Sequence, residues 1–330
     1  MAQLTNERKQ KFGRPDFPDA AEEIVESFES GTILGASRTI RLISEVFRIQ
    51  VREAEGKEGP ELASEIQQTG RYFIKTRGSL SPAVGNAITW MLDGLPQGNK
   101  DVSVADVCAF IEKRTHQFDE KSMADVERIA EFGSNLLEDG QRVMAYDYSS
   151  TVNAVLRRAA ENGKHLTVVI PESRSLDGGM PILEEVVVFG HDALFTHDVA
   201  MGHELRSCSA VFVGVESLSA NGGFWTTVGT CSLAVLADYY SVPLFAPTEL
   251  LKIDPNSYEG LRRTTDRVAI RNFDDREFPA GEGTIVLEID DLEFTPRHLV
   301  SAYITEQGVL PPEAIWTVAR KFYEGKQQIA

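Results

Sequence analysis

The stretch DGQRVMAYDYSSTVNAVLRRAAENGKHLTVVIPESRSLDGG, residues 139–179, decides the fold class of this 330-residue chain. It contains two short runs rich in apolar and β-branched residues, Arg142–Tyr146 and His165–Ile170, which are typical of buried strands. A helical pattern over Thr151–Asn162 lies between them. A strand, a helix and a second strand in this succession predict a right-handed βαβ unit with parallel strands.

The same alternation continues toward the end of the chain. The pattern predicts further strands at Glu185–Phe189, Ala210–Val213, Pro243–Ala246 and Thr284–Glu288, with helices near Val199–Leu205 and over Thr230–Tyr240. We therefore expect residues 141–330 to form a Rossmann-like domain with a mostly parallel sheet. Ligands in such sheets bind at the carboxyl ends of the strands, so the loops that follow the strands are the ones to examine.

The N-terminal half has a different, helical pattern. Apolar residues recur at spacings of three and four over residues 18–121, and glycine- and proline-rich breaks divide this region into five or six helices. Residues 1–17 are expected to form a flexible or loosely docked arm, and residues 122–140 a connecting helix. The predicted fold class is α/β, with an all-helical N-terminal domain followed by the Rossmann-like domain.

Composition excludes several functional classes. The formal charge of −17 argues against non-specific nucleic-acid binding, which needs an excess of Lys and Arg. The chain contains no apolar run of about 18 residues, and its polar first residues lack the apolar core of a signal peptide. Three cysteines without paired spacing favour a reducing compartment. We expect a cytoplasmic protein with no membrane contact, no metal site and no cofactor.

Two loops of the second half have residues suited to holding a phosphate. Asp147–Thr151 follows the first strand, is rich in hydroxyl groups and opens a helix, whose free N–H groups favour an anion. The next strand leads to Arg174, whose guanidinium can clamp a phosphate. An ordinary helix cap explains the first loop equally well, and an exposed arginine is common, so both interpretations stay open.

Glycines mark two further segments of the second half and lie near two arginines of the helical half. Asn221-Gly222-Gly223 and Val228-Gly229-Thr230 follow the strand Ala210–Val213, and the second of them opens a helix. Neither segment is a Walker or dinucleotide-binding motif, and tight turns would explain both. In the helical half, Arg38 and Arg77 lie near glycine breaks; each is a candidate phosphate ligand or a solvated surface residue.

Taken together and in this order, these segments resemble one family. It contains the alpha, beta and delta subunits of translation initiation factor 2B, methylthioribose-1-phosphate isomerase and ribose-1,5-bisphosphate isomerase. The residues that carry the resemblance are GASR at 35–38, the R-x-x-x-x-P-A-V stretch from Arg77, DGQRVMAYDYSSTV at 139–152, VVIPESRSLDGG at 168–179, FVGVESLSANGGFWTTVGT at 212–230 and YITEQGVLPPEAI at 303–315. The resemblance therefore covers nearly the whole chain.

The resemblance implies a ligand as well as a fold. It implies a pocket for a small phosphorylated sugar or a nucleoside monophosphate between the two domains, and dimerisation or higher assembly through the C-terminal domain. The residues expected to contact the ligand are Gly35, Ala36, Arg38, Arg77, Ser149, Ser150, Arg174, Asn221 and Gly222.

The chain departs from the isomerase pattern at three places. The family's isomerases have Cys after the first strand and Asp after the VGA strand; here these positions are Asp147 and Glu216. The family's Asn-Lys pair is Thr226-Thr227. Aldose–ketose isomerisation moves a proton between adjacent carbons, and two carboxylates can share that work if burial raises the pKa of one.

Three hypotheses follow. In the leading one, Asp147 and Glu216 are the catalytic residues of a sugar-phosphate aldose–ketose isomerase. In the second, the site is a sensor that binds its ligand without turnover, as in the regulatory alpha subunit. In the third, the chain is a subunit of a guanine-nucleotide exchange assembly. Trp225, within a glycine-rich loop, is expected either to cover the pocket or to pack against protein.

Overall fold

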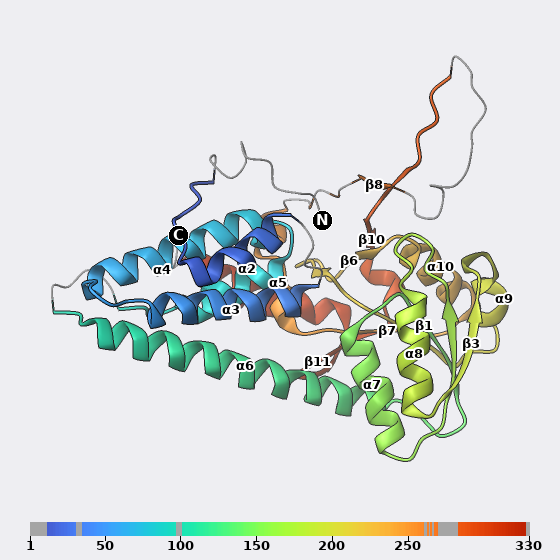
Figure 1. The fold of residues 1–330 in the computed structure, drawn as a ribbon. Helices are drawn as coiled ribbons and strands as arrows, with labels where there is room; N and C mark the ends of the chain where they lie inside the picture. Colours follow the sequence, from blue (N-terminus) through green and yellow to red (C-terminus); the bar gives the residue numbers. More distant parts are fainter. Residues whose placement is uncertain are drawn as a thin grey trace. The chain divides into compact units, whose positions relative to one another are not determined.

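The computed structural model describes residues 12–30, 35–96, 101–260, 263, 265, 267–269 and 283–327. The chain divides into two compact units. The first comprises residues 1–124, 251–253 and 322–330, and the second comprises residues 125–250 and 254–321. Each unit is described by itself (Figure 1).

The first unit is built from helices. They are α2 (Asp19–Glu29), α3 (Ala36–Arg52), α4 (Gly59–Phe73), the π-helical turn η1 (Ile74–Gly78), α5 (Pro82–Leu92) and the first two thirds of α6 (Val104–Ser134). The apolar spacing predicted from the sequence accounts for the core, because Ile40, Ile43 and Phe47 point from one face of α3 into it. Before α2, Phe17 is buried and Arg14 pairs with Glu22, so the arm is docked from there on.

A seven-stranded sheet forms the centre of the second unit. Its strands are β1 (Arg142–Tyr146), β2 (Thr167–Pro171), β3 (Asp192–Thr196), β4 (Ala210–Val213), β7 (Leu244–Pro247), β11 (Ala302–Thr305) and β12 (Gly308–Leu310). Their order is β12-β11-β7-β4-β1-β2-β3, and every neighbouring pair is parallel except β11 with β12. This is the doubly wound order, in which the chain runs outward from β1 in one direction and from β4 in the other.

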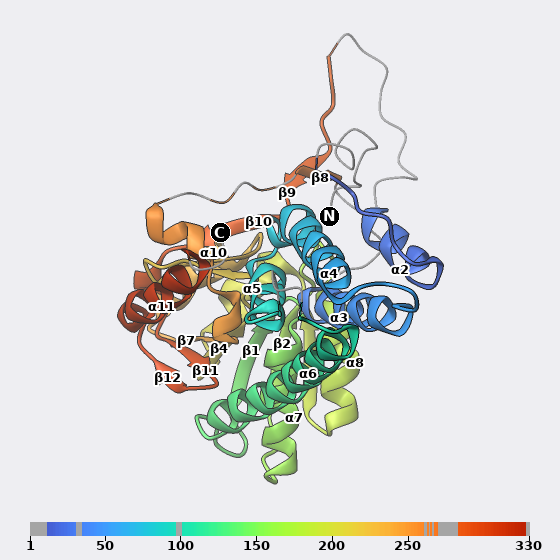
Figure 2. The same ribbon diagram turned by 90° about the vertical axis from the view of Figure 1, so that its left-hand side faces the viewer.

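The helices of this unit complete the connections. They are α7 (Ser150–Glu161), α8 (Gly179–Phe189), η2 (Asp198–Ala200), α9 (Met201–Leu205), α10 (Thr230–Tyr240) and residues 315–321 of α11 (Ile315–Gln327), with the short turns η4 (Pro255–Glu259), η5 (Arg297–Leu299) and η6 (Pro312–Ala314). The turn η3 (Leu250–Lys252) begins in this unit and ends in the first. Figures 1 and 2 show α7 and α8 side by side along the sheet. Val143 and Ala145 of β1 join their core, while Met144 and Tyr146, also buried, alternate to the opposite face.

Two smaller sheets accompany the main one. Strands β5 (Ser217–Leu218), β6 (Phe224–Thr227) and β10 (Leu292–Thr295) form an antiparallel sheet in the order β10-β6-β5. Strands β8 (Arg267–Ala269) and β9 (Glu288–Asp290) pair with each other. In the sequence, β5 and β6 lie between β4 and α10, so they follow the carboxyl end of β4, and β10 joins them from later in the chain.

Three sequence expectations about elements were wrong. Glu185–Phe189 is the end of helix α8, not a strand: Ile182 and Val186 are buried four residues apart, whereas Val188 is 82% exposed. Its β-branched run suggested a strand, but the flanking Gly190, in the left-handed conformation, ends a helix. Residues 122–134 continue α6 and do not start a separate connecting helix. Residues 284–287 have no regular structure, and β9 begins at Glu288.

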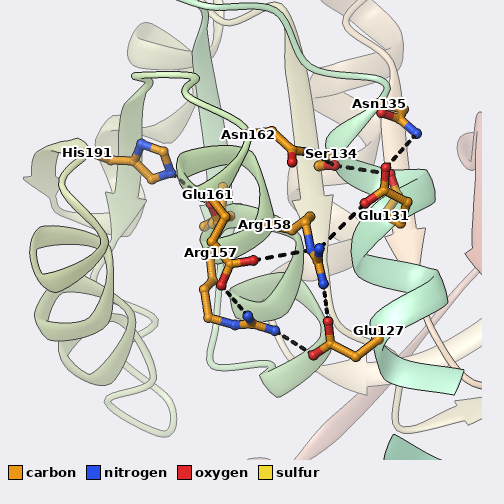
Figure 3. A network of polar contacts seen from close by, with 10 residues as sticks. Glu127, Glu131, Ser134, Asn135, Arg157, Arg158, Glu161, Asn162 and His191 are labelled. Atoms are coloured by element: carbon orange, nitrogen blue, oxygen red, sulfur yellow. Dashed lines mark hydrogen bonds and ion pairs between the residues drawn. The ribbon is translucent and has the colours of Figure 1, made fainter. Parts of the chain in front are cut away.

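A network of ion pairs joins α7 to the C-terminal part of α6 (Figure 3). Glu127 of α6 accepts hydrogen bonds from Arg157, at 2.7 Å, and from Arg158. Arg157 and Arg158 also pair with Glu161 on their own helix, and Arg158 lies 3.8 Å from Glu131. These groups are between about a quarter and half exposed. The network therefore links α7 to α6 near the C-terminal end of α7, away from the N-terminus of that helix.

Candidate functional site

The site lies where the sheet reverses its direction of winding. Asp147 directly follows β1 and Gly214 directly follows β4, and these two strands are paired in parallel. The loops that follow these strands approach each other closely: a Cβ atom added to Gly214 would lie 2.7 Å from the Cβ of Ser149. Ligands of doubly wound sheets bind at such a switch point, at the carboxyl ends of the diverging strands.

Asp147 is held in an unusual position. Its φ angle is 59°, in the left-handed region that residues other than glycine rarely adopt. Its Oδ1 accepts a hydrogen bond from Ser173 Oγ at 2.8 Å, and its Oδ2 accepts one from Thr227 Oγ1 at 2.5 Å. A Cβ atom added to Gly178 would lie 1.8 Å from Oδ1, so the carboxylate fits only because this residue is glycine. Backbone strain of this kind is concentrated at functional sites.

The surroundings of Asp147 favour its protonated form. Burial raises the pKa of this carboxyl above its ordinary range, and the negative charge of Asp198 adds to the increase. Hydrogen bonds from Thr227 and Ser173 and from the Tyr148 amide act in the opposite direction and offset part of that rise. A carboxyl group with a raised pKa is suited to exchanging protons near neutral pH.

The loop after β2 supplies one of these partners. Ser173 is fully buried and has a φ angle of 49°, and Asp177 in the same loop has a φ angle of 55°. The carboxylate of Asp198, at the start of η2, accepts hydrogen bonds from the backbone N–H groups of Ser173 and Arg174, both at 2.9 Å. Of the four non-glycine residues with positive φ in the described chain, three are thus Asp147 itself and two residues of the neighbouring loop.

Tyr146 lies beneath the site. It is the last residue of β1, is buried, and donates a hydrogen bond from its hydroxyl to the carbonyl oxygen of Val228 at 3.0 Å. Burial raises the pKa of this phenol, and the charge of Asp198 raises it further. The hydroxyl approaches so closely that a Cβ atom on Gly229 would lie 2.0 Å from it, which explains the need for glycine there.

The predicted phosphate ligands of the second unit reach this edge in different ways. Ser149 caps α7, accepting the Val152 N–H at 3.4 Å, and its hydroxyl lies 2.9 Å from that of Thr151. Ser150, the first residue of α7, is exposed. Arg174 is 47% exposed and lies 3.8 Å from Glu172. The cap therefore exists as an ordinary helix cap, Ser150 is exposed beside it, and Arg174 is exposed on the loop after β2.

Glu216 is on the segment that leads from β4 to β5. Its backbone N–H donates to the carbonyl oxygen of Trp225 at 2.9 Å, and its side chain is partly buried. Glu216 and Asp147 both belong to the described part of the chain, and no hydrogen bond joins their side chains in that part. The structure therefore brings Asp147 together with Ser173 and Thr227, not directly with its expected partner.

A carboxylate that the sequence reasoning missed occupies one predicted anion position. Oε1 of Glu293, on β10, accepts hydrogen bonds from the N–H groups of Gly229, at 2.7 Å, and Cys231, at 2.8 Å. The start of α10, one of the candidate phosphate loops, is therefore filled by the chain's own anion. The sequence pattern could not show this contact, because Glu293 is 64 residues from Gly229 and reaches α10 through the pairing of β10 with β6.

Asn221 and Gly222 make turn contacts. Asn221 is exposed and its side-chain oxygen accepts the Gly223 N–H at 2.9 Å, while the Gly222 carbonyl accepts the hydroxyl of Tyr303 at 2.8 Å. Gly222 has a φ angle of 83°, and a Cβ atom there would lie 2.3 Å from the Pro312 carbonyl oxygen. These contacts account for the asparagine and glycine as a structural turn.

Trp225 packs against protein. The centroid of its ring lies 5.4 Å from the ring centroid of Phe294, which is on the neighbouring strand β10. Trp225 therefore packs within the small sheet, which is one of the two roles expected for it.

The remaining predicted ligands belong to the helical unit. Gly35, with a φ angle of 86°, precedes α3, and Ala36 and Arg38 lie in its first turn, where Arg38 is exposed. Arg77 is only 3% exposed and lies on the π-helical turn η1. Burial lowers the pKa of its guanidinium, while Tyr72 and Glu29 raise it. π-Helical turns are often found at functional sites.

Among the described residues, no group of three or more His, Cys, Asp or Glu side chains has the arrangement of a metal site. Within the same part of the chain, no helix combines the length and the apolar character that crossing a membrane requires.

Comparison with known proteins now identifies the family. The sequence profile of the Initiation factor 2 subunit family matches residues 32–312. The chain belongs to this family. The resemblance inferred from the sequence motifs is thereby confirmed.

Curated relatives of this family member include both isomerases and initiation-factor subunits. It is 24% identical to a protein named ribose 1,5-bisphosphate isomerase from Methanocaldococcus jannaschii, over 92% of this chain and 96% of the relative. It is 26% identical to the protein of the same name from Pyrococcus furiosus, over 88% and 90%. It is also 24% identical to a translation initiation factor 2B subunit delta from Dictyostelium discoideum, but it spans only 53% of that longer protein.

Solved structures confirm the fold. The structure of 5-methylthioribose 1-phosphate isomerase from Pyrococcus horikoshii is similar with a TM-score of 0.72 and 20% identity, covering 92% of this chain and 87% of the other. A translation initiation factor 2B structure from the same organism has a TM-score of 0.71 and 22% identity, covering 90% and 98%. The predicted combination of a helical N-terminal region with a mostly parallel sheet is therefore correct.

Proposed function

We propose that this family member binds a phosphorylated sugar at the carboxyl edge of its sheet and catalyses aldose–ketose isomerisation of it. Asp147 carries the proposal, because it is a carboxyl with a raised pKa, fixed by two hydroxyl groups at the switch point of the sheet. The isomerase relatives, which align along almost their whole length, support the choice of reaction.

The chemistry follows from what a carboxyl group can do. Isomerisation moves the hydroxyl proton of the carbon next to the carbonyl to the carbonyl oxygen, and it also moves a proton from that carbon itself to the carbonyl carbon. Asp147 is proposed to carry that proton, and its fixed hydrogen bonds would keep its position constant while its charge changes. Glu216, on the segment after β4, is proposed as the second acid–base group.

The phosphate is proposed to bind at the start of α7. Ser150 is exposed there and Ser149 caps the helix, and Arg174, exposed on the loop after β2, is proposed to reach the same phosphate. A helix N-terminus and a guanidinium are the groups that recognise phosphate in proteins. The start of α10 is not proposed as a ligand site, because Glu293 already occupies it. Contacts from Gly35, Ala36, Arg38 and Arg77, and from Asn221 and Gly222, stay predictions.

A sensor that binds without turnover is the second candidate. One observation favours it: both oxygens of Asp147 already accept a hydrogen bond from the protein. A relative that is an initiation-factor subunit is consistent with a regulatory role. In this alternative, Asp147 would shape the pocket and would not exchange a proton with the ligand.

One experiment separates the two candidates. The purified chain is incubated with ribose 1,5-bisphosphate, the compound in the relatives' names, and the mixture is followed by 31P and 1H NMR while thermal shift reports binding. A ketose product supports the isomerase. A raised Tm without product supports the sensor. If this compound and a panel of sugar phosphates and nucleoside monophosphates give neither a thermal shift nor a product, both the isomerase and the sensor are contradicted.

The chain is also proposed to form a homo-oligomer, at least a dimer. The support is the family, in which one solved assembly is described as a tetrameric beta2-delta2 complex. Light scattering during size-exclusion chromatography measures the mass directly. A monomer at micromolar concentration would contradict this proposal without affecting the proposed chemistry.

A further inference from the structure

Asp198 holds the loop after β2 in place through its backbone. The two oxygens of its carboxylate accept hydrogen bonds from consecutive N–H groups, those of Ser173 and Arg174, each at 2.9 Å. Charge-assisted hydrogen bonds of this kind are stronger than neutral ones. Asp198 lies in η2, after the edge strand β3, so it acts on the loop from a separate element.

The residue that Asp198 holds is one that would not adopt its conformation unaided. Ser173 has a φ angle of 49°, where the Cβ atom of an L-residue is crowded by its own backbone. It is also fully buried, so its N–H group needs a partner within the protein. The carboxylate of Asp198 satisfies that N–H group and opposes the return of the residue to an ordinary conformation.

The conformation of Ser173 in turn aims its hydroxyl at Asp147. Oγ of Ser173 donates to Oδ1 of Asp147 at 2.8 Å. A chain of contacts therefore leads from Asp198 through the backbone of Ser173 to the carboxyl group at the switch point. We infer that Asp198 is a positioning residue, which acts on Asp147 through the orientation of the Ser173 hydroxyl. The catalytic part of this inference rests on the proposed function; the contact itself does not.

Asp198 also acts on Asp147 through its charge, and the two effects have opposite signs. Its negative charge raises the pKa of Asp147, whereas the hydrogen bond from Ser173 that it maintains lowers the pKa and is the larger of the two effects. The other groups near Asp147 are the Thr227 hydroxyl, the Tyr148 amide and the phenol of Tyr146. The charges of Asp198 and Glu293 raise the pKa of that phenol.

A double-mutant cycle that needs no substrate separates the two effects. The pKa of Asp147 is measured by 13C NMR of labelled aspartate carboxyls, with the signal assigned by its absence in Asp147→Asn. Asp198→Asn is expected to raise that pKa in the wild-type background, because the amide keeps only one uncharged acceptor oxygen for the two N–H groups and so loosens the hold on Ser173. In the Ser173→Ala background the same substitution is expected to lower it, because only the charge remains to be lost. Asp192→Asn, on the exposed end of β3, is the control and should change neither.

Other outcomes overturn the inference. If Asp198→Asn lowers the pKa of Asp147 in both backgrounds, Asp198 acts only through its charge, and if it changes neither, Asp198 does not act on Asp147. Asp198→Glu covers the case in which Asp198→Asn fails to fold, because it keeps the charge and displaces the acceptor oxygens. It should raise the pKa of Asp147, and an unchanged value contradicts positioning. If the chain forms no ketose, the proposed function fails while this test is unaffected.

Discussion

Two carboxylates of the second unit, at opposite ends of the same helix, are held in contrasting ways. Asp147, just before α7, is bound by the hydroxyl groups of Ser173 and Thr227 and has a raised pKa. Glu127 faces the outer part of α7 and is bound by the guanidinium groups of Arg157 and Arg158 (Figure 3). Although desolvation acts to raise the pKa of Glu127, its arginine partners lower the pKa overall.

The contrast teaches what each carboxylate is suited for. A carboxylate paired with arginines in a half-exposed network stays ionised and supports the fold. A carboxyl confined among hydroxyl groups has no opposite charge in those contacts, so its ionised form is costly in the folded protein. Groups that destabilise the fold in this way are characteristic of sites that exchange protons or bind ligands.

Gly178→Ala is expected to have a large effect on turnover. The added Cβ atom would lie 1.8 Å from Oδ1 of Asp147, so the carboxyl group must leave its position. Misplacement of a reacting group by about 1 Å can lower the rate about 100-fold, and we expect a decrease in kcat of that order. The control is Gly202→Ala in α9, whose Cβ would be 3.5 Å from its nearest neighbours, in ordinary contact. Equal activity of the two variants would show that the position of Asp147 is unimportant.

Glu216→Gln is expected to lower kcat by roughly 10- to 100-fold, within the range of acid–base contributions, while KM changes little. The reason is that glutamine keeps the shape of the side chain but carries no exchangeable carboxyl proton. Steady-state kinetics measure both constants. Glu288→Gln, about half exposed on β9, is the matched control. Unchanged kcat would remove Glu216 from the mechanism and leave Asp147 without a second carboxylate.

Substitution of the two carboxylates by amides is expected to change stability in opposite directions. A raised folded-state pKa means that ionised Asp147 destabilises the fold above the pKa of the unfolded chain. Asp147→Asn should therefore raise the free energy of unfolding at pH 7, and the gain should vanish as pH falls below about 4. The surrounding hydroxyls can donate or accept and so accommodate the amide.

Glu127→Gln has the opposite sign for the same linkage reason. Its pKa is lowered by the arginines, so its contribution to stability is present above the unfolded value of about 4.3 and is lost as pH falls. Because the group is half exposed, the loss at pH 7 should be below about 1 kcal/mol. Urea unfolding at pH 7 and pH 4 measures both variants. If both changes had the same sign at pH 7, the comparison between the two carboxylates would be wrong.

Salt should produce the smallest difference. At about 1 M NaCl the screening length falls to about 3 Å, which weakens exposed pairs more than buried ones. The cost of Glu127→Gln should therefore shrink by a few tenths of a kcal/mol, whereas the gain from Asp147→Asn should stay nearly constant. Repeating the urea titrations with added salt gives this measurement. A larger salt effect at Asp147 would indicate that its carboxyl group is solvated.

The sequence predicted strands β1, β2, β4 and β7, whose residues are mostly buried, but it missed the less buried edge strands β3 and β12 and the buried strand β11. Arg142–Tyr146, Ala210–Val213 and the helix Thr230–Tyr240 match the structure residue for residue. Glu185–Phe189 failed because β-branched residues on the exposed side of a helix look like a strand when burial is unknown. The small sheet of β5, β6 and β10 was missed because its strands are short and pair across some 65 residues.

The site was predictable only in part. Asp147 and the seryl groups of α7 could be found because they directly follow a predicted strand. Ser173 and Thr227 could not be assigned as partners of Asp147, because left-handed backbone and side-chain direction bring them together over 26 and 80 residues. Glu293 was missed for the same reason, since strand pairing alone places it at the start of α10. Spacing along the chain shows which loops meet, but not which atoms do.

The central claim is that Asp147 exchanges a proton with a bound sugar phosphate. The most direct test compares kcat of the wild-type chain, Asp147→Asn and Asp192→Asn with ribose 1,5-bisphosphate, while calorimetry measures substrate affinity on the same samples. The account predicts that Asp147→Asn lowers kcat by about 100-fold or more, leaves affinity within about threefold, and that Asp192→Asn matches the wild type. Turnover by Asp147→Asn at the wild-type rate would contradict it.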